Sequence, residues 1–263
     1  MLHRIGFLLL VGLGIAVAGR AQSTAPTGCE GVPDTLNCKL IEDFESYPLG
    51  GPPTRWRDTK DRELVRLSED GVMTPRKNVN VRRENDNQFA RIYTEAKALR
   101  VVRTRRNGLD WNLEKRPVLR WKWRATALPE GANEKDRDRN DTGGAVYVTL
   151  DTDWLGRPKS IKYTYSSSLP VGTTVDYGPL KVLVVASKAE QGLGAWIAHE
   201  RNVVADYKRL FGERPDTTPA AVVIWGDSNN MDSVSTVDFD DLLVLSGTTA
   251  SRSESTTASS GAR

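Results

Sequence analysis

The chain contains 263 residues, of which 38% are hydrophobic, and it carries a formal net charge of +3. Two of its arginines, Arg4 and Arg20, lie at the N-terminus, so the rest of the chain is close to neutral. A near-neutral chain lacks the basic surface by which proteins neutralise phosphate backbones, which excludes nucleic acid as a partner. The length suits one sandwich or barrel domain.

Residues 1–21 have the pattern of a secretory signal peptide. Arg4 gives the positive start, residues 7–17 form an apolar run, and small residues follow at positions 16–21. No later segment approaches 18 apolar residues, so we expect no transmembrane segment after cleavage. The sequence therefore predicts export, to the periplasm or to the outside of the cell.

Residues 22–38 form a small, polar lead-in peptide that contains both cysteines of the chain, Cys29 and Cys38. Two cysteines in one short stretch of an exported chain most simply form a disulfide. A zinc site is disfavoured because no histidine lies nearby and the spacing is not that of a zinc knuckle.

Short apolar blocks separated by polar turns fill residues 39–245, which we predict to be a single domain. In 118–125, Leu119, Trp121 and Trp123 alternate with basic residues, as expected of a strand with one covered face. The blocks comprise residues 40–44, 79–81, 89–93, 99–104, 118–125, 145–150, 161–165, 180–186, 195–201, 220–225 and 237–245. This spacing predicts an all-β, antiparallel β-sandwich.

One short helix interrupts the strand-like blocks. Asn202 is placed to cap it, Val203, Tyr207 and Phe211 share a helical face, and Gly212 ends it. Beyond the domain, residues 246–263 are rich in serine and threonine with almost no apolar content. We predict this tail to be disordered, because it cannot offset the entropy of ordering.

Four blocks of this chain, in order, resemble an uncharacterised bacterial family known as domain of unknown function 3047. They are residues 116–151 (RPVLRWKWRATALPEGANEKDRDRNDTGGAVYVTLD), 161–172 (IKYTYSSSLPVG), 192–215 (GLGAWIAHERNVVADYKRLFGERP) and 221–230 (AVVIWGDSNN). The family has no established activity, so the resemblance assigns no site residues.

The two ends of the domain are similar to the first and last strands of jelly-roll, galactose-binding-like carbohydrate-binding modules. The segments are residues 41–56 (IEDFESYPLGGPPTRW) and 235–245 (STVDFDDLLVL). The similarity implies that the two strands are neighbours and that their acidic residues hold a structural calcium. Glu45 together with Asp240 or Asp241 would supply its ligands.

Two tryptophans in polar loops are the candidate ligand-binding residues. Trp154 and Trp111 lie in loops, where a large side chain can remain exposed, and a sugar ring could stack on either. The polar residues that could orient such a ring are Asp151, Asp153, Asp227 and Asn230. Trp121 and Trp123 are interpreted instead as core.

The sequence offers little for catalysis. After the leader the only histidine is His199, and neither a GxSxG nor an HExxH motif occurs. Paired loop carboxylates remain, as in glycosidases; the candidates are Asp141, Asp151, Asp153, Glu200, Asp206 and Asp227. The acidic loop at 136–141 is either a calcium loop or, more simply, a solvated surface loop.

These observations favour an exported, non-catalytic protein that binds carbohydrate or a cell-envelope glycan, with calcium as its candidate cofactor. Two alternatives stay open. One is a carbohydrate-active enzyme that uses two loop carboxylates, and the other is a structural envelope protein that acts through a protein partner. The arginines of 100–106 form either a solvated strand edge or an anion-binding patch.

Overall fold

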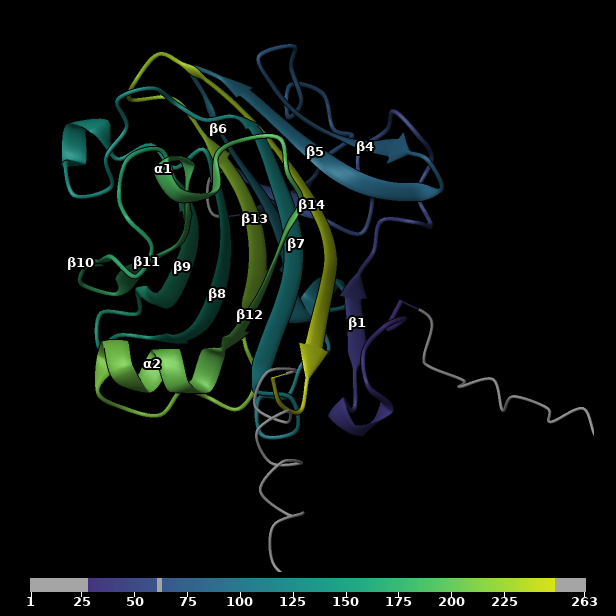
Figure 1. The fold of residues 1–263 in the computed structure, drawn as a ribbon, viewed down its shortest axis with the longest axis vertical. Coiled ribbons are helices and arrows are strands. Elements are labelled where there is room, and N and C mark those ends of the chain that lie inside the picture. Colours follow the sequence, from purple (N-terminus) through teal and green to yellow (C-terminus); the bar gives the residue numbers. More distant parts are fainter. Residues whose placement is uncertain (1–27, 61–62, 249–263) are drawn as a thin grey trace, which may run out of the picture.

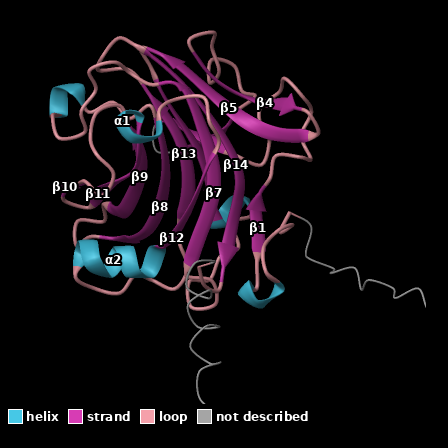
Figure 2. Ribbon diagram, viewed as in Figure 1, coloured by secondary structure: helices cyan, strands magenta, loops and turns pink. Residues whose placement is uncertain are grey.

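Two β-sheets stacked face to face dominate the computed structural model, which describes residues 28–60 and 63–248 (Figures 1 and 2). The predicted β-sandwich is thereby confirmed. The leader predicted for residues 1–21 lies outside the described residues, as does the predicted tail from residue 249 onward.

The six-stranded sheet has the order β12-β7-β14-β5-β4, and β1 pairs with the far end of β14. Its strands are β1 (Lys39–Glu42), β4 (Lys77–Glu84), β5 (Asn87–Glu95), β7 (Val118–Ala127), β12 (Ile197–Asn202) and β14 (Val234–Leu245). All pairings in this sheet are antiparallel. The first and last strands of the domain are therefore neighbours, as the end-strand similarity implied.

The eight-stranded sheet has the order β10-β11-β9-β8-β13-β6-β2-β3. Its strands are β2 (Arg57–Lys60), β3 (Glu63–Arg66), β6 (Ala98–Thr104), β8 (Gly144–Thr152), β9 (Pro158–Ser166), β10 (Thr174–Tyr177), β11 (Leu180–Ser187) and β13 (Ala221–Asp227). All pairs are antiparallel except β9 with β11, which is parallel.

One large hydrophobic core fills the space between the sheets. Trp121 and Trp123 of β7 are fully buried in it, so the core interpretation of these two residues is confirmed. Their rings are 5.5 Å apart, edge to face, and each also packs on a tyrosine of β9. The alternation in the sequence predicted this because successive side chains of a strand point to opposite faces.

The predicted short helix is α2 (Val203–Phe211). The Asn202 side chain accepts a hydrogen bond from the amide of Ala205, and Gly212 ends the helix in a left-handed conformation. A second helix, α1 (Lys188–Gln191), forms a single turn after β11. In the described part of the chain, no helix is long and apolar enough to cross a membrane.

The predicted disulfide between Cys29 and Cys38 is present. It encloses a short 3-10 helix, Asp34–Leu36, and Cys29 and Leu36 pack against Val118 and Leu245. The bridge closes a loop within the lead-in peptide, and the apolar side chains of that loop pack on the ends of β7 and β14.

Candidate functional site

The outer face of the eight-stranded sheet carries a group of side chains that we call the Trp225 patch: Arg100, Tyr147, Lys162, Trp225 and Asp227. Alternation along each strand places them there. Val146 and Val148 of β8 point into the main core, so Tyr147 between them faces away from the other sheet. Together with Trp225, Tyr147 packs against a separate small apolar cluster on this outer face.

Strand register brings the patch together from four strands. In the register, Tyr147 of β8 is opposite Lys162 of β9, and Trp225 of β13 is opposite Arg100 of β6. The rings of Tyr147 and Trp225 are 5.3 Å apart and tilted by 35°. Both rings are partly exposed. The pair forms an aromatic surface of the kind on which flat ligands stack.

Two cations flank the Trp225 ring. The guanidinium carbon of Arg100 is 4.3 Å from the ring centroid, and the Lys162 ammonium is 6.0 Å away. Lys162 also lies 5.5 Å from the ring of Tyr147. Both cations attract the negative faces of the rings. The patch is therefore aromatic and positively charged at once.

Lys162 is 6% exposed, and its charge has no close counter-ion in the described structure. The lysines that form ion pairs there are Lys39, Lys77, Lys122, Lys159 and Lys181. Burial disfavours the ammonium, but Tyr147, Asp227 and Glu134 outweigh this and raise the pKa of Lys162. The residue is thus a protonated, nearly buried cation.

Two carboxyl groups border the patch. Burial raises the pKa of Asp227 to about 6, although Lys162 acts in the opposite direction. Burial also raises the pKa of Glu134, whose Oε2 accepts a hydrogen bond of 2.6 Å from Ser166. Within the described residues, no hydrogen bond of normal geometry reaches Oδ1 of Asp227 or Oε1 of Glu134. Perturbed, incompletely bonded groups of this kind gather at functional sites.

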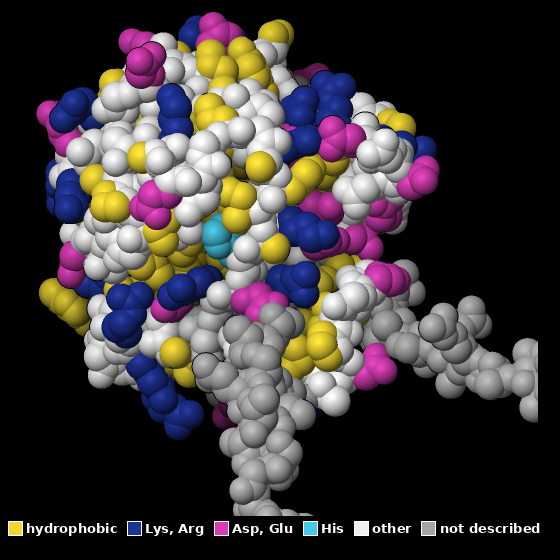
Figure 3. Space-filling view, in the orientation of Figure 1, with side chains coloured by type: hydrophobic (Ala, Val, Ile, Leu, Met, Phe, Trp, Pro, Cys, Tyr) yellow, Lys and Arg dark blue, Asp and Glu magenta, His cyan; other side chains and the backbone are white. Residues whose placement is uncertain are grey.

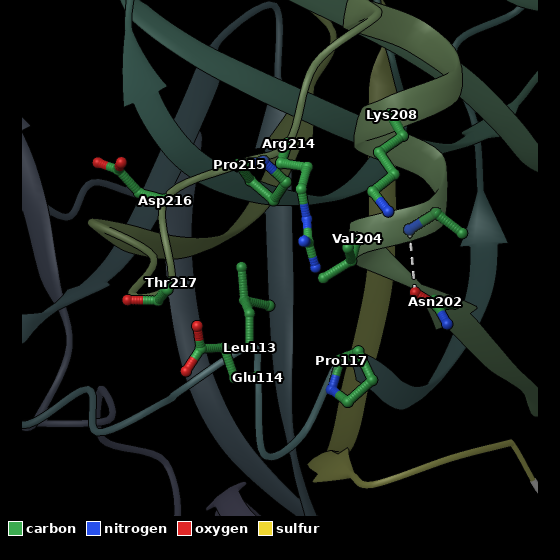
Figure 4. A pocket seen from close by; sticks show the side chains of 11 residues that line it. Leu113, Glu114, Pro117, Asn202, Val204, Lys208, Arg214, Pro215, Asp216 and Thr217 are labelled. Carbon is green, nitrogen blue, oxygen red and sulfur yellow. Dashed lines mark hydrogen bonds between the residues drawn. The ribbon is translucent and has the colours of Figure 1, made fainter.

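A cavity of about 560 Å3 lies elsewhere, between α2 and residues 113–117 and 214–217 (Figure 4). Its charged side chains, Glu114, Lys208, Arg214 and Asp216, are all exposed. Water solvates exposed charges at little cost, so these side chains do not need a ligand as a partner. We therefore place the candidate site at the Trp225 patch.

A second cavity, of about 300 Å3, opens where β11 and β12 border the gap between the sheets. His199 lines it and packs 5.1–5.3 Å from Trp123 and Trp121. His199 is the described histidine, drawn cyan in Figure 3 among hydrophobic side chains. Burial, aided by the charge of Arg201, lowers the pKa of His199 to about 4. His199 is thus an uncharged side chain at the edge of the hydrophobic core.

This pKa predicts acid-sensitive stability. An ordinary histidine in the unfolded chain binds its proton near pH 6.5, whereas His199 in the folded chain does not until about pH 4. The free energy of unfolding should therefore fall as the pH drops from 6.5 to 4, by up to about 3 kcal/mol. His199→Phe should show a smaller loss over this interval in urea unfolding at pH 7 and pH 4.5. An equal loss in both proteins would contradict this role.

Trp154 lies in the turn between β8 and β9 and is 89% exposed. Asp153 shapes that turn, because its side chain accepts hydrogen bonds from the amides of Leu155 and Arg157. Asp151, half-buried, accepts from the amide of Thr152. Trp154 is therefore available to a ligand, and its predicted binding role stays a prediction.

Trp111 is placed differently from what its loop position suggested. It is 2% exposed, packs in the main core, and donates from Nε1 to the carbonyl of Arg116. Its ring faces are not accessible to a ligand in this conformation. Loop membership did not leave this side chain exposed, because the loop folds back over the end of the sandwich.

Of the predicted polar ligands, the structure brings only Asp227 into the patch. It lies beside the start of β8, while Trp154 follows the end of that strand. At about 3.3 Å per residue the strand between them is about 25 Å long, so Asp227 and Trp154 do not share one site. Asn230 instead joins two loops, because its side chain donates to the carbonyl of Arg137 and to Asn140. Asp141 accepts from the amides of Asn230 and Met231.

The residues predicted to hold calcium each have another partner. Glu45 accepts from the amide of Gln88, Asp240 accepts from the side chain of Asn87, and Asp241 pairs with Lys122 at 2.6 Å. Within residues 28–60 and 63–248, no group of three or more histidine, cysteine or acidic side chains is arranged to hold a metal. Calcium binding at the chain ends stays a prediction.

Fold and patch together define a two-sheet β-sandwich with an aromatic, cationic surface on one outer face. A model of the family described as "Protein of unknown function (DUF3047)" matches residues 71–243. The chain therefore belongs to this family, as its four sequence blocks indicated. No curated protein matches it by sequence.

Solved structures similar to this chain include three carbohydrate-binding modules. A family 11 module from a cellulosomal cellulase of Clostridium thermocellum is 8% identical, with 81% of this chain and 96% of that chain covered and a TM-score of 0.40. A family 30 module of the same organism is 13% identical (79% and 96% covered, TM-score 0.40). A module of Caldicellulosiruptor saccharolyticus, solved with mannohexaose, is 10% identical (81% and 98% covered, TM-score 0.38). These overlaps are loose, so the ligands of those proteins are not transferred to this chain.

Proposed function

We propose that this protein binds carbohydrate through the Trp225 patch. The observation that carries the proposal is the paired, partly exposed rings of Tyr147 and Trp225 on an outer sheet face. The axial C–H groups of a sugar ring pack on such a surface, and stacking buries apolar area without excluding the sugar hydroxyls from polar partners.

Polar groups around the rings suit hydroxyl recognition. The Asp227 carboxylate interacts with the Trp225 indole N–H, and the exposed guanidinium of Arg100 offers further N–H donors beside the rings. Side chains held by a sheet are also preorganised, so little ordering entropy would be lost on binding.

A carbohydrate-active enzyme is the second candidate, because Asp227 and Glu134 border the same patch and both have raised pKa values. A general acid of a glycosidase needs such a pKa. Binding without turnover is the function we favour, since it requires only the aromatic pair and its polar neighbours.

The proposal is tested by calorimetric titration of the full chain with a panel of soluble oligosaccharides and polysaccharides. We expect saturable binding of at least one glycan, and Tyr147→Ala should weaken it about tenfold or more because half of the stacking surface is lost. Reducing ends are measured in the same samples, and their release would select the enzyme. A panel without any bound glycan would overturn the proposal.

We also propose that the protein acts outside the cytoplasm. The signal-peptide pattern of residues 1–21 and the disulfide Cys29–Cys38 support it, because disulfides persist mainly in oxidising compartments. Finding the uncleaved chain in the cytoplasmic fraction of its native cell would contradict it.

A further inference from the structure

The charge of the Trp225 patch restricts its ligand beyond the sugar class. Lys162 sits in the middle of the eight-stranded sheet, between Val182 of β11 and Tyr147 of β8 in the register. An ammonium held there loses most of its water, and such a group is normally paired with an anion. The described chain supplies carboxyl groups in the vicinity, yet none forms an ion pair with Lys162.

Arg100 supplies a second cation on the same side of the sheet. It is exposed, and its guanidinium stacks on the Trp225 ring rather than on a carboxylate. A stacked guanidinium keeps its in-plane N–H groups free for a bidentate hydrogen bond with a carboxylate or a sulfate. Other arginines of the sandwich, such as Arg91 and Arg124, are instead committed to ion pairs with Asp238.

The described carboxyl groups near the patch form no ion pair with its two cations. Burial disfavours the ionised form of Glu134 and raises the pKa of this carboxyl group. Asp141 accepts hydrogen bonds from two backbone amides, and burial together with the charge of Asp141 raises the pKa of Asp227. Within the described residues neither Lys162 nor Arg100 forms an ion pair, so both cations are available to an anion on a ligand.

We propose that the carbohydrate bound at this patch is an acidic glycan, whose sugar ring stacks on Tyr147 and Trp225 while its anionic group is bound by Lys162 and Arg100. This inference rests on the proposed function and adds the chemical class of the ligand. The shared chemistry is an anion on a sugar ring, carried by a uronic acid as carboxylate or by a sulfated sugar as a sulfate ester. Neutral glycans would leave both cations unpaired.

The test compares oligosaccharides that differ only in charge. Tetragalacturonate and its full methyl ester present the same rings, and a sulfated galactan oligomer of equal length presents the other anion. Calorimetric titration of the full chain at low salt should give about tenfold tighter binding of an acidic ligand than of the ester, because charge-assisted hydrogen bonds are the stronger ones. The difference should shrink at high salt.

Substitutions at the two cations test whether they cause the preference for an acidic ligand. Lys162→Met keeps the length of the side chain without its charge, and we expect binding of the acidic ligand to fall to that of the ester. Arg100→Met should act in the same direction, and because Arg100 is exposed it leaves the fold intact even if the Lys162 variant is unstable. Lys122→Met is the matched control, since Lys122 pairs with Asp241 on the other sheet and should not alter the preference.

Each outcome decides between the two claims. Equal binding of the acid and the ester, still weakened by Tyr147→Ala, would overturn the acidic-glycan inference and leave the proposed function standing. A preference for acid that Lys162→Met and Arg100→Met do not reduce would also overturn it. If no sugar binds, neutral or acidic, the proposed function and the inference both fail.

Discussion

Replacing Glu42 by glutamine should cost far more stability than replacing a glutamate that pairs at the surface. Glu42, at the end of β1, is 1% exposed and is surrounded by donors. Its carboxylate accepts hydrogen bonds from Tyr47, Trp56, Arg55 and Arg103 at 2.7–3.0 Å. One carboxylate thus fixes the start of the domain onto β6.

The expected loss is about 3–5 kcal/mol, because the variant leaves Arg103 buried without its counter-charge. Glutamine keeps the size of the side chain but turns an amide donor toward other donors. Glu84→Gln is the control: Glu84 is exposed and pairs with Arg124 at the surface, so the change should cost less than about 1 kcal/mol. Urea unfolding at pH 7 measures both values. Equal losses would show that the Glu42 network does not stabilise the fold.

Trp225→Ala should produce the largest loss of binding, about 30-fold or more for whichever glycan the chain binds. The substitution removes the larger ring of the stacking pair, and it also removes the surface on which Arg100 is held. Central aromatic residues typically cost 2 kcal/mol or more when truncated to alanine. Calorimetric titration measures the change, and circular dichroism checks that the sandwich is retained.

Trp196→Ala is the matched control for this experiment. Trp196 is also a partly exposed tryptophan flanked by arginine, but it packs with Phe89 and Arg124 on the outer face of the other sheet. In Figure 3, basic and acidic side chains intermix over this face. Binding should survive Trp196→Ala. If Trp154→Ala weakens binding and Trp225→Ala does not, the site lies at the β8–β9 turn, as the sequence predicted.

The sequence could predict the fold because its signals are local. The alternation of Leu119, Trp121 and Trp123 with basic residues identifies a strand with one covered face, and Asn202 and Gly212 mark the ends of the helix α2. The spacing of the two cysteines indicated their disulfide. Each of these features depends on a few adjacent residues and on physical rules that hold without knowledge of the partner strand.

The candidate site could not be predicted in the same way, because it is assembled by cross-strand register. Tyr147, Lys162 and Trp225 each occur within an apolar block that predicts a strand and nothing more. Only the pairing of β6, β13, β8 and β9 brings them to one face. The one local signal was Lys162, a charge in the middle of an apolar strand. Trp111 shows the opposite error, since a polar loop gave no sign that the ring packs inward.

Site-resolved observation of the tryptophans during a titration tests the location of the binding site most directly. The chain contains seven tryptophans, and 15N labelling gives each indole N–H its own signal in a heteronuclear spectrum. The signal of Trp225 is assigned by its loss in Trp225→Phe, and those of Trp154 and Trp196 in the same way. We expect a bound glycan to shift the Trp225 indole and to leave Trp196 unchanged. A saturable shift at Trp154 or Trp196, with the Trp225 signal unmoved, would contradict the assignment of the site to the eight-stranded sheet.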